Sequence, residues 1–437
     1  MILKRIILLL LVSNTLFAQQ SANGKYNFQD FSLIVKVEDQ EKLYHEMLKE
    51  KPADPAKPNM YSEYRAQLAL GWLNKGDFKR YWAYKKMNTS FNVLQFLYLT
   101  YALEYLMDAD KDIAEVEKVS ADLMEDIKQK KLNDGIGRVH TLYELNAAAN
   151  AKLGNTEKAL QLMDKYTTRK WEARDMNYFR DSRSNYLHRY AIVMAAAGKT
   201  QAAFDTLSKA FKMADSNPKM VATFRTVYKK LKGSDKGFDV YLKSLQEEAY
   251  QKYYKEVEKS YIATPQQTMQ GFITGPGTDG KKMTLFTGKQ PVKDISLMNL
   301  EGKMVSLGDY SGKILVVDFW STLCTPCVAA FSGFERVVED YKKEPFQLFV
   351  INLFEDEATV KSYVEKRKIP LQVLRDEENK AYDIQGTPTK IVFDPTGNIR
   401  FYASGYAGST DREYYKLKAM VEIVKAKNSD LAKVQGH

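Results

Sequence analysis

The hydrophobic pattern of this 437-residue chain changes once along its length. From about Asn27 to Tyr261, apolar residues recur at helical spacing, whereas from about Val292 onward short β-branched runs alternate with helical stretches. A chain this long exceeds one ordinary hydrophobic core, so we expect separate domains. The pattern predicts an α-helical N-terminal domain (27–261) and an α/β C-terminal domain (292–437). Between them we place a linker (262–291), because its later part is dense in Gly, Pro and Lys.

The first 20 residues, MILKRIILLLLVSNTLFAQQ, have the layout of a secretory signal peptide. Lys4 and Arg5 precede an apolar run (6–12), and a polar break ends at Ala18. The run is far shorter than the roughly 20 residues that a membrane-spanning helix needs, and no cysteine lies near the cleavage site to carry a lipid. We therefore expect cleavage after Ala18, with 1–18 as the signal peptide, and an exported, soluble mature protein.

The helical half contains a weak internal repeat of small residues. Two segments carry Ala, Gly and Ala at relative positions 0, 7 and 12, namely Ala147, Gly154 and Ala159, then Ala191, Gly198 and Ala203. This resembles the tetratricopeptide helical hairpin, although the two glycines are 44 residues apart and that family repeats at about 34. An irregular helical bundle is the alternative interpretation. A tetratricopeptide-like array would present a surface for a protein partner.

Both cysteines of the chain, Cys324 and Cys327, lie in the stretch DFWSTLCTPC. A bridge at this spacing encloses almost no loop and would add little stability, so redox chemistry is favoured over a structural role. Exported proteins meet an oxidising environment, in which such a pair can cycle. A structural zinc would need further ligands, but the C-terminal domain has no other cysteine and only one histidine, His437. We expect no metal and no cofactor beyond the dithiol.

The segment GKILVVDFW (312–320) predicts a buried central strand, and the residues after Cys324 have helical spacing. Cys324 is therefore expected at a helix N-terminus, where amide groups and the helix dipole stabilise a thiolate. Cys327, one turn further on, should be shielded, and Pro326 suits a first helical turn. The following segments predict a strand (346–353), a helix (357–368), a strand (370–374), a hairpin (386–405) and a final helix (411–427).

The order of strand, C-x-x-C, helix, strand, helix and a Thr-Pro that opens a hairpin resembles the thioredoxin fold. The upstream segment VKDISLMNLEGKMVSLGDYSGK is similar to the extra hairpin of the exported TlpA-type thiol-disulfide oxidoreductases of the redoxin superfamily. The segment GTPT (386–389) is similar to the cis-proline loop of that family. The resemblance covers about one third of the chain, and the predicted fold is an α-helical, tetratricopeptide-like domain followed by an α/β thioredoxin-fold domain.

The resemblance implies roles for four residues of the C-terminal domain. Cys324 would be the nucleophile and Cys327 the resolving thiol. Pro388 would be a cis proline facing this pair, and the backbone of Thr387 would pair with an extended substrate chain.

Two further candidates precede the cysteines. Asp318 matches the buried acid of thioredoxin, and a buried carboxyl should be partly neutral and able to take a proton from Cys327. The alternative is a strand-end residue turned to solvent. Trp320 resembles the packing tryptophan of these folds; packing is the favoured role, and it is also a candidate for substrate binding.

The chain departs from the TlpA-type pattern around its cysteines. Leu323 replaces a usual Trp, and Val328, Ala330 and Ser332 replace a frequent basic residue, Glu and Pro. These changes concern substrate recognition. The carboxyl of Asp318 could offset the acid that is missing at position 330, where the chain has Ala330.

The leading hypothesis is a periplasmic thiol-disulfide oxidoreductase that reduces disulfides of exported proteins and draws electrons from a membrane donor. The net charge of +10 is spread over both halves, so nucleic acid is not expected as a partner. One alternative is a peroxiredoxin-like peroxidase, although the P-x-x-x-T-x-x-C arrangement is absent. Another is a partner-binding helical scaffold with an accessory redox domain.

Overall fold

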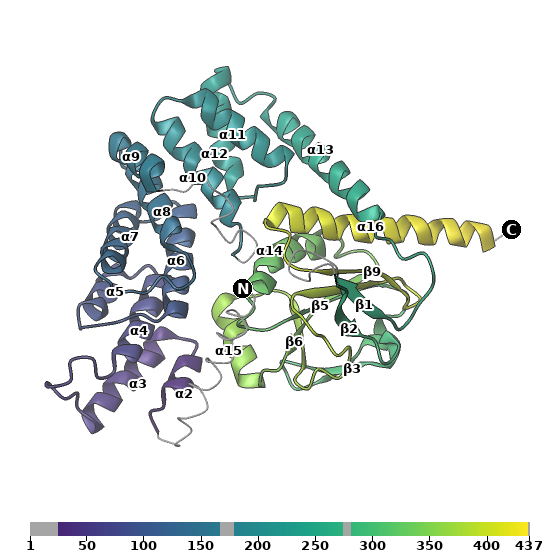
Figure 1. Cartoon of the computed structure of the whole chain (residues 1–437), viewed down its shortest axis with the longest axis horizontal. Helices are drawn as coiled ribbons and strands as arrows, with labels where there is room; N and C mark the ends of the chain where they lie inside the picture. The colour runs from purple at the N-terminus through teal and green to yellow at the C-terminus, as the bar shows by residue number, and fades with distance from the viewer. Residues whose placement is uncertain (1–24, 167–178, 274–280, 436–437) are drawn as a thin grey trace.

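The computed structural model describes residues 25–166, 179–273 and 281–435. Over these residues the chain forms a helical N-terminal domain and a C-terminal domain built on a sheet, as the sequence predicts (Figure 1). The predicted signal peptide lies outside the described residues and stays a prediction. Within the described ranges, the helices are too short or too polar to cross a membrane.

The N-terminal domain is a succession of helices. In chain order they are α2 (Phe28–Leu33), α3 (Val37–Glu50), α4 (Ser62–Asn74), α5 (Phe78–Lys85), α6 (Val93–Asp108), α7 (Ile113–Lys128), α8 (Val139–Lys152), α9 (Thr156–Tyr166), α10 (Ser182–Ala196), α11 (Thr200–Lys212), α12 (Met220–Lys232) and α13 (Phe238–Glu258).

The repeated small residues occupy the helical hairpins that the sequence suggests. Gly154 lies in the turn between α8 and α9, and Gly198 in the turn between α10 and α11, with φ of +85° and +75°. Glycine reaches this left-handed region without steric cost, which allows so tight a turn. The four matching alanines are fully buried: Ala147, Ala159, Ala191 and Ala203. Whether the array is of the tetratricopeptide type stays a prediction.

The C-terminal domain is built around a seven-stranded sheet with strand order β4-β3-β7-β6-β5-β8-β9. The elements of this domain in chain order are β1 (Gln270–Ile273), β2 (Met283–Thr287), β3 (Ser296–Asn299), β4 (Met304–Ser306), β5 (Ile314–Trp320), α14 (Thr325–Asp340), β6 (Phe346–Leu353), α15 (Glu357–Arg367), β7 (Gln372–Asp376), β8 (Thr389–Phe393), β9 (Ile399–Ser404) and α16 (Thr410–Gln435). Strands β5, β6 and β7 run parallel, and β8 is antiparallel to β5. This is the thioredoxin-like arrangement predicted from the sequence, and the predicted extra hairpin is β3–β4.

Strand β5 is the centre of this sheet, and all of its residues are buried. On one face, Val316 and Trp320 join a hydrophobic cluster with α14, α16 and α13. On the other face, Val317 and Phe319 join a cluster that includes Tyr382 and residues of the β1–β2 hairpin. Burial on both faces explains why β5 is a continuous apolar run in the sequence.

Part of the segment predicted as a linker is a component of the C-terminal fold. Strands β1 and β2 lie within 262–291 and pair as an antiparallel hairpin. Leu285 and Phe286 of β2 are buried in the cluster that covers one face of the large sheet. The backbone amide of Gln385 also donates a hydrogen bond to the Leu285 carbonyl (2.7 Å). This part is therefore ordered by packing rather than acting as a simple connector.

The helical domain contacts the C-terminal domain near both ends of the helical array. Figure 1 shows the array curving along one side of the sheet domain, with α2 beside α15 and α13 beside α16. The Ser362 hydroxyl on α15 donates to the Leu33 carbonyl (2.6 Å). Ala249 and Tyr253 of α13 are buried in the same cluster as α16. The two domains therefore share a hydrophobic core instead of being tethered only by a flexible segment.

Candidate functional site

The two cysteines lie at the start of α14, where the central strand β5 gives way to a helix. Cys324 is the N-cap residue and forms a disulfide with Cys327. Pro326 lies in the first helical turn, where a missing N–H costs no helical hydrogen bond. Cys324 is half-buried and Cys327 is fully buried. Only Cys324 therefore has a sulfur that an external molecule can approach.

The loop before Cys324 is fixed by an acid that the sequence analysis did not single out. Glu355 accepts hydrogen bonds from the Thr322 backbone amide (2.8 Å) and from the Thr322 hydroxyl. It also accepts one from the Asn352 side chain (2.7 Å). Since parallel β5 and β6 end at the same edge of the sheet, an acid just after β6 could have been suspected from the sequence. Glu355 holds the loop that leads into the dithiol.

Two large apolar side chains are exposed on the loops that Glu355 connects. Leu323, next to Cys324, is 65% exposed, and Phe354, next to Glu355, is 66% exposed. Exposed apolar side chains that gather on one surface often mark a site of interaction. The surface around Cys324 thus offers apolar contacts to an incoming molecule.

The Thr387–Pro388 peptide bond is cis, as the resemblance implies. Pro388 immediately precedes β8, and Thr389 lies opposite Phe319 in the β5–β8 ladder. The register therefore places Pro388 at the level of the end of β5, where the loop to Cys324 begins. The Pro388 carbonyl accepts a hydrogen bond from the Gly405 amide (3.0 Å), and the Thr387 side chain is exposed.

The structure corrects the suggestion that Trp320 binds substrate. Its side chain is fully buried, because β5 is central and α14 covers this face of the sheet. Its ring packs edge-to-face on Phe331 (5.2 Å between centroids) and lies 5.8 Å from Tyr363. Trp320 is therefore a core residue beneath the site.

Asp318 is fully buried, so the alternative of a solvent-facing strand end is wrong. It follows the alternation of β5 on to the face with Val316 and Trp320, the face covered by α14. Burial raises the pKa of Asp318 from its ordinary 3.8 to about 8, the nearby Lys390 opposes this rise, and Glu413 adds to it. Neither Lys390 nor Glu413 was singled out from the sequence.

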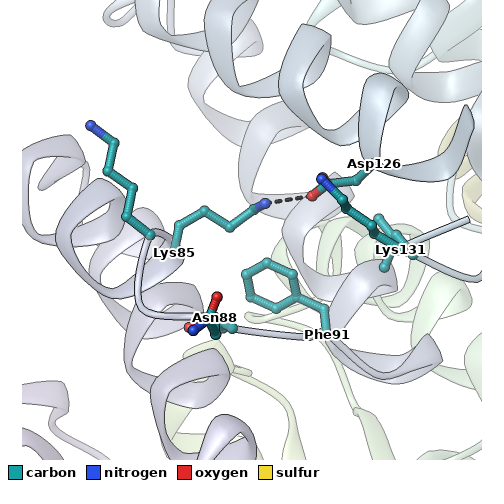
Figure 2. A pocket seen from close by; sticks show the side chains of 8 residues that line it. Lys85, Asn88, Phe91, Asp126 and Lys131 are labelled. Atoms are coloured by element: carbon teal, nitrogen blue, oxygen red, sulfur yellow. Dashed lines mark hydrogen bonds and ion pairs between the residues drawn. The ribbon is translucent and has the colours of Figure 1, made fainter. Parts of the chain in front are cut away.

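A separate cavity lies within the helical domain. Figure 2 shows Lys85, Asn88, Phe91, Asp126 and Lys131 around it, and its volume is about 210 Å³. Its lining comes wholly from the loop around α5 and from the end of α7, so it is not part of the dithiol site. Lys85 is paired with the Asp126 carboxylate, which offsets the positive charge of this cavity.

The family comparison matches the region that holds the dithiol. The model of the AhpC/TSA family matches residues 289–402, which span β3 to β9 and both cysteines. Residues 289–402 form an AhpC/TSA-family domain. The enzyme class predicted from the sequence, an oxidoreductase, is confirmed with it.

Named relatives of this AhpC/TSA-family domain are bacterial redox proteins. The chain is 28% identical over 134 residues to the thiol-disulfide oxidoreductase ResA of Halalkalibacterium halodurans, covering 30% of this chain and 76% of that protein. It is 25% identical over 124 residues to ResA of Bacillus subtilis, covering 26% and 69%.

Among solved structures, a thiol:disulfide interchange protein DsbE of Chlorobium tepidum matches at 25% identity with a TM-score of 0.26. The match covers 29% of this chain and 93% of that chain. A thioredoxin of Neisseria meningitidis matches at 27% identity with a TM-score of 0.28, covering 33% and 93%.

Proposed function

We propose that the protein is an exported thiol-disulfide oxidoreductase that reduces disulfides of other exported proteins. The observation that carries this proposal is the asymmetry of the dithiol. Cys324 is half-buried at a helix N-terminus, while Cys327 is fully buried one turn further on. The first sulfur can react with a partner, and the second can react only with the first.

The reaction begins with the reduced dithiol. The Cys324 thiolate attacks one sulfur of a substrate disulfide, and the other substrate sulfur leaves as a thiolate. Cys327 then gives its proton to Asp318 and attacks Cys324, which forms the Cys324–Cys327 disulfide and releases the second substrate thiol. Two electrons pass from the dithiol to the substrate.

Substrate chain is proposed to lie across the Thr387–Pro388 loop. Thr387 is exposed two residues before β8 and close to the level of the end of β5, where an extended chain could pair with its backbone. The exposed side chains of Leu323 and Phe354 supply apolar contacts on the other side of Cys324. A hydrophobic segment beside a disulfide would suit this surface best.

Export and electron supply are proposed on the basis of the sequence. The predicted signal peptide supports a periplasmic location, and each turnover there would leave the Cys324–Cys327 pair oxidised. A reductase there needs a steady donor, for which we propose a membrane protein that passes electrons from the cytoplasm. A protein partner on the helical domain stays a prediction.

The direction of electron flow is tested by the equilibrium reduction potential of the Cys324–Cys327 pair against a dithiothreitol series. We expect a value below about −200 mV, on a scale that runs from about −270 mV for thioredoxin to about −120 mV for a strong oxidant. A value near the strong oxidants would reverse the assigned direction.

The identity of the substrates is tested with Cys327→Ser in the exporting cell. This variant should retain protein substrates as mixed disulfides on Cys324, because the resolving attack is blocked. Cys324→Ser is the matched control and should retain none. Recovery of equal amounts of bound protein with both variants would contradict the proposal.

A further inference from the structure

A buried lysine lies opposite Asp318 in the central sheet. Asp318 on β5 and Lys390 on β8 are direct partners in the antiparallel ladder. Side chains of paired residues share a face, and the neighbours Val316 and Val392 place that face under α14 and α16. Two ionisable groups from segments 72 positions apart in the sequence thus meet inside the hydrophobic core.

Lys390 is itself paired with a buried acid from the last helix. Its ammonium group bonds to the Glu413 carboxylate on α16, and the two side chains are only 7% and 2% exposed. The same ammonium lies 4.7 Å from the centre of the Phe334 ring on α14. Glu413 also accepts a hydrogen bond from the Ala407 amide (3.0 Å). The lysine is fixed between the helix that carries the dithiol and the helix that follows the cis-proline hairpin.

The surroundings of Asp318 contain few other charges. Among the described residues, Lys390 from β8 and Glu413 from α16 are the charged groups that act on its carboxyl. Strand β6 places the apolar Val350 opposite Asp318, and α14 contributes the buried Cys327, which is in its disulfide form, to this face. Both carboxyl oxygens of Asp318 are buried without a hydrogen-bond partner among the described residues. The charge state of Asp318 therefore depends on burial and on the Lys390–Glu413 pair.

We propose that Lys390 and Glu413 are positioning residues of the dithiol reaction, which set how readily Asp318 accepts the proton of Cys327. The ammonium of Lys390 stabilises the Asp318 carboxylate, and Glu413 weakens this effect by sharing the charge of the lysine. This inference rests on the proposed function, because it concerns the resolving step in which Cys327 attacks Cys324.

The pair is hard to explain by stability alone. Burying two charges is energetically costly, and replacing such a pair by apolar residues is often neutral or stabilising. The Lys390–Glu413 pair also lies beside Asp318, the acid that accepts the proton of Cys327 in the proposed reaction. Its position is therefore better explained by an effect on Asp318 than by a contribution to folding.

The proton step can be isolated with a small aromatic disulfide. In the full-length mature protein, reduced Cys324 is converted at low pH to a mixed disulfide with 5-thio-2-nitrobenzoate, and the pH is then raised. Cys327 loses its proton to Asp318 and attacks Cys324, the internal disulfide forms, and the coloured thiolate leaves. No further oxidant or reductant is required. The rate of colour release, measured over a pH series, gives the apparent pH midpoint of the resolving step.

The two members of the pair should move this midpoint in opposite directions. Lys390→Met removes the charge that favours the carboxylate, so the midpoint should move to higher pH, by roughly one to three pH units. In Glu413→Gln the positive charge of Lys390 is no longer shared with Glu413 and stabilises the Asp318 carboxylate more strongly. The midpoint should therefore move to lower pH. A purely structural role would disturb both variants in the same direction.

Two further variants serve as controls for misfolding. The double variant K390M/E413Q leaves no unpaired buried charge, and its midpoint should lie above that of the wild type, because burial alone then acts on Asp318. Arg400→Met removes a cation from another buried ion pair of the same hairpin, Arg400–Asp394 (2.7 Å), and should leave the midpoint unchanged.

The outcomes separate this inference from the proposed function. If the wild type releases colour through Cys327 but neither single variant moves the midpoint, or both move it the same way, the inference is overturned while the proposed function stands. If the wild type and Cys327→Ser release colour equally, there is no resolving step, and the proposed function fails as well.

Discussion

Asp318 lies directly opposite Lys390 in the β5–β8 ladder, and both side chains are buried. This relationship joins the strand that leads to the dithiol with the hairpin that follows the cis proline. The two buried groups lie on the face of the sheet that α14 covers, where the proposed reaction needs Cys327 to lose a proton.

The stability of the oxidised protein should fall as pH rises from about 4 to about 8. Burial raises the pKa of Asp318 from 3.8 to about 8, so the folded state holds a proton that the unfolded chain releases between these values. The free energy of unfolding therefore decreases with pH over this range. In Asp318→Asn this part of the decrease should be absent, and near pH 8 the free energy of unfolding of the variant should exceed that of the wild type by on the order of 5 kcal/mol. Urea unfolding across this range measures both, and an unchanged slope in the variant would contradict the assignment.

Gly333→Ala should destabilise the packing of α14 against α16. A Cβ at this position would lie 2.7 Å from the Cβ of Glu413 and 2.9 Å from the Tyr414 backbone nitrogen, so the helices would have to separate. We expect a loss of about 1–3 kcal/mol, as for other overpacked cores. Chemical denaturation measures it, with Glu339→Ala on the exposed side of α14 as the control. Equal stability of the two variants would mean that the helices can move apart freely.

Glu355→Ala should loosen the loop that leads to Cys324. The Thr322 amide, its hydroxyl and the Asn352 side chain would all lose their acceptor. We expect a loss of about 1–3 kcal/mol in stability, because these donors are partly buried. The catalytic efficiency of disulfide reduction should fall by roughly tenfold, since the nucleophile is less well placed.

The control for Glu355→Ala is Glu357→Ala, two residues further on. Glu357 is 47% exposed, and its partner Arg375 also pairs with Glu377, so the arginine keeps an acid when Glu357 is removed. Turnover assays and thermal unfolding should show a near-wild-type control. An active, stable Glu355→Ala would show that the loop holds its shape without this acid.

Asp181→Ala should weaken the attachment of the helical domain to the redox domain. The Asp181 carboxylate, at the start of α10, accepts hydrogen bonds from the Thr410 amide (2.7 Å) and hydroxyl (2.8 Å) in the first turn of α16. We expect a loss of about 1–2 kcal/mol, the usual cost of removing a side-chain acceptor from a helix start. Asp181→Asn keeps one acceptor oxygen and should lose less. Thermal unfolding of the two variants makes the comparison, and identical losses would rule out the hydrogen bonds as the cause.

Much of the redox domain could be predicted because its signals are local. The run 312–320 is apolar throughout, since β5 is buried on both faces, and the predicted strand 346–353 coincides with β6. The hydrophobic spacing changes from a continuous apolar run to helical spacing just after β5, which predicts that Cys324 lies at the start of a helix. In the structure Cys324 is the N-cap residue of α14. The glycine turns of the helical hairpins were likewise visible, because only a few residues decide them.

Other features could not be predicted, because they depend on contacts between distant segments. The β1–β2 hairpin looks like a linker in the sequence, and only the cluster around Phe286 shows that it belongs to the sheet domain. The docking of α13 on α16 and the bonds of Asp181 to Thr410 have no local signature. The sequence leaves Trp320 a candidate for substrate contact, and only the packing of α14 over β5 shows that its side chain is buried.

The sequence by itself determined which sulfur chemistry is available and where it sits. Both cysteines lie in one strand-to-helix segment, so local periodicity was enough to place them. Only the tertiary structure decided which charges surround that chemistry. Asp318, Lys390 and Glu413 come from three separate elements, and strand register and helix packing bring them together. The cost of burying a charge depends on neighbours contributed by the whole fold, and no local pattern encodes it.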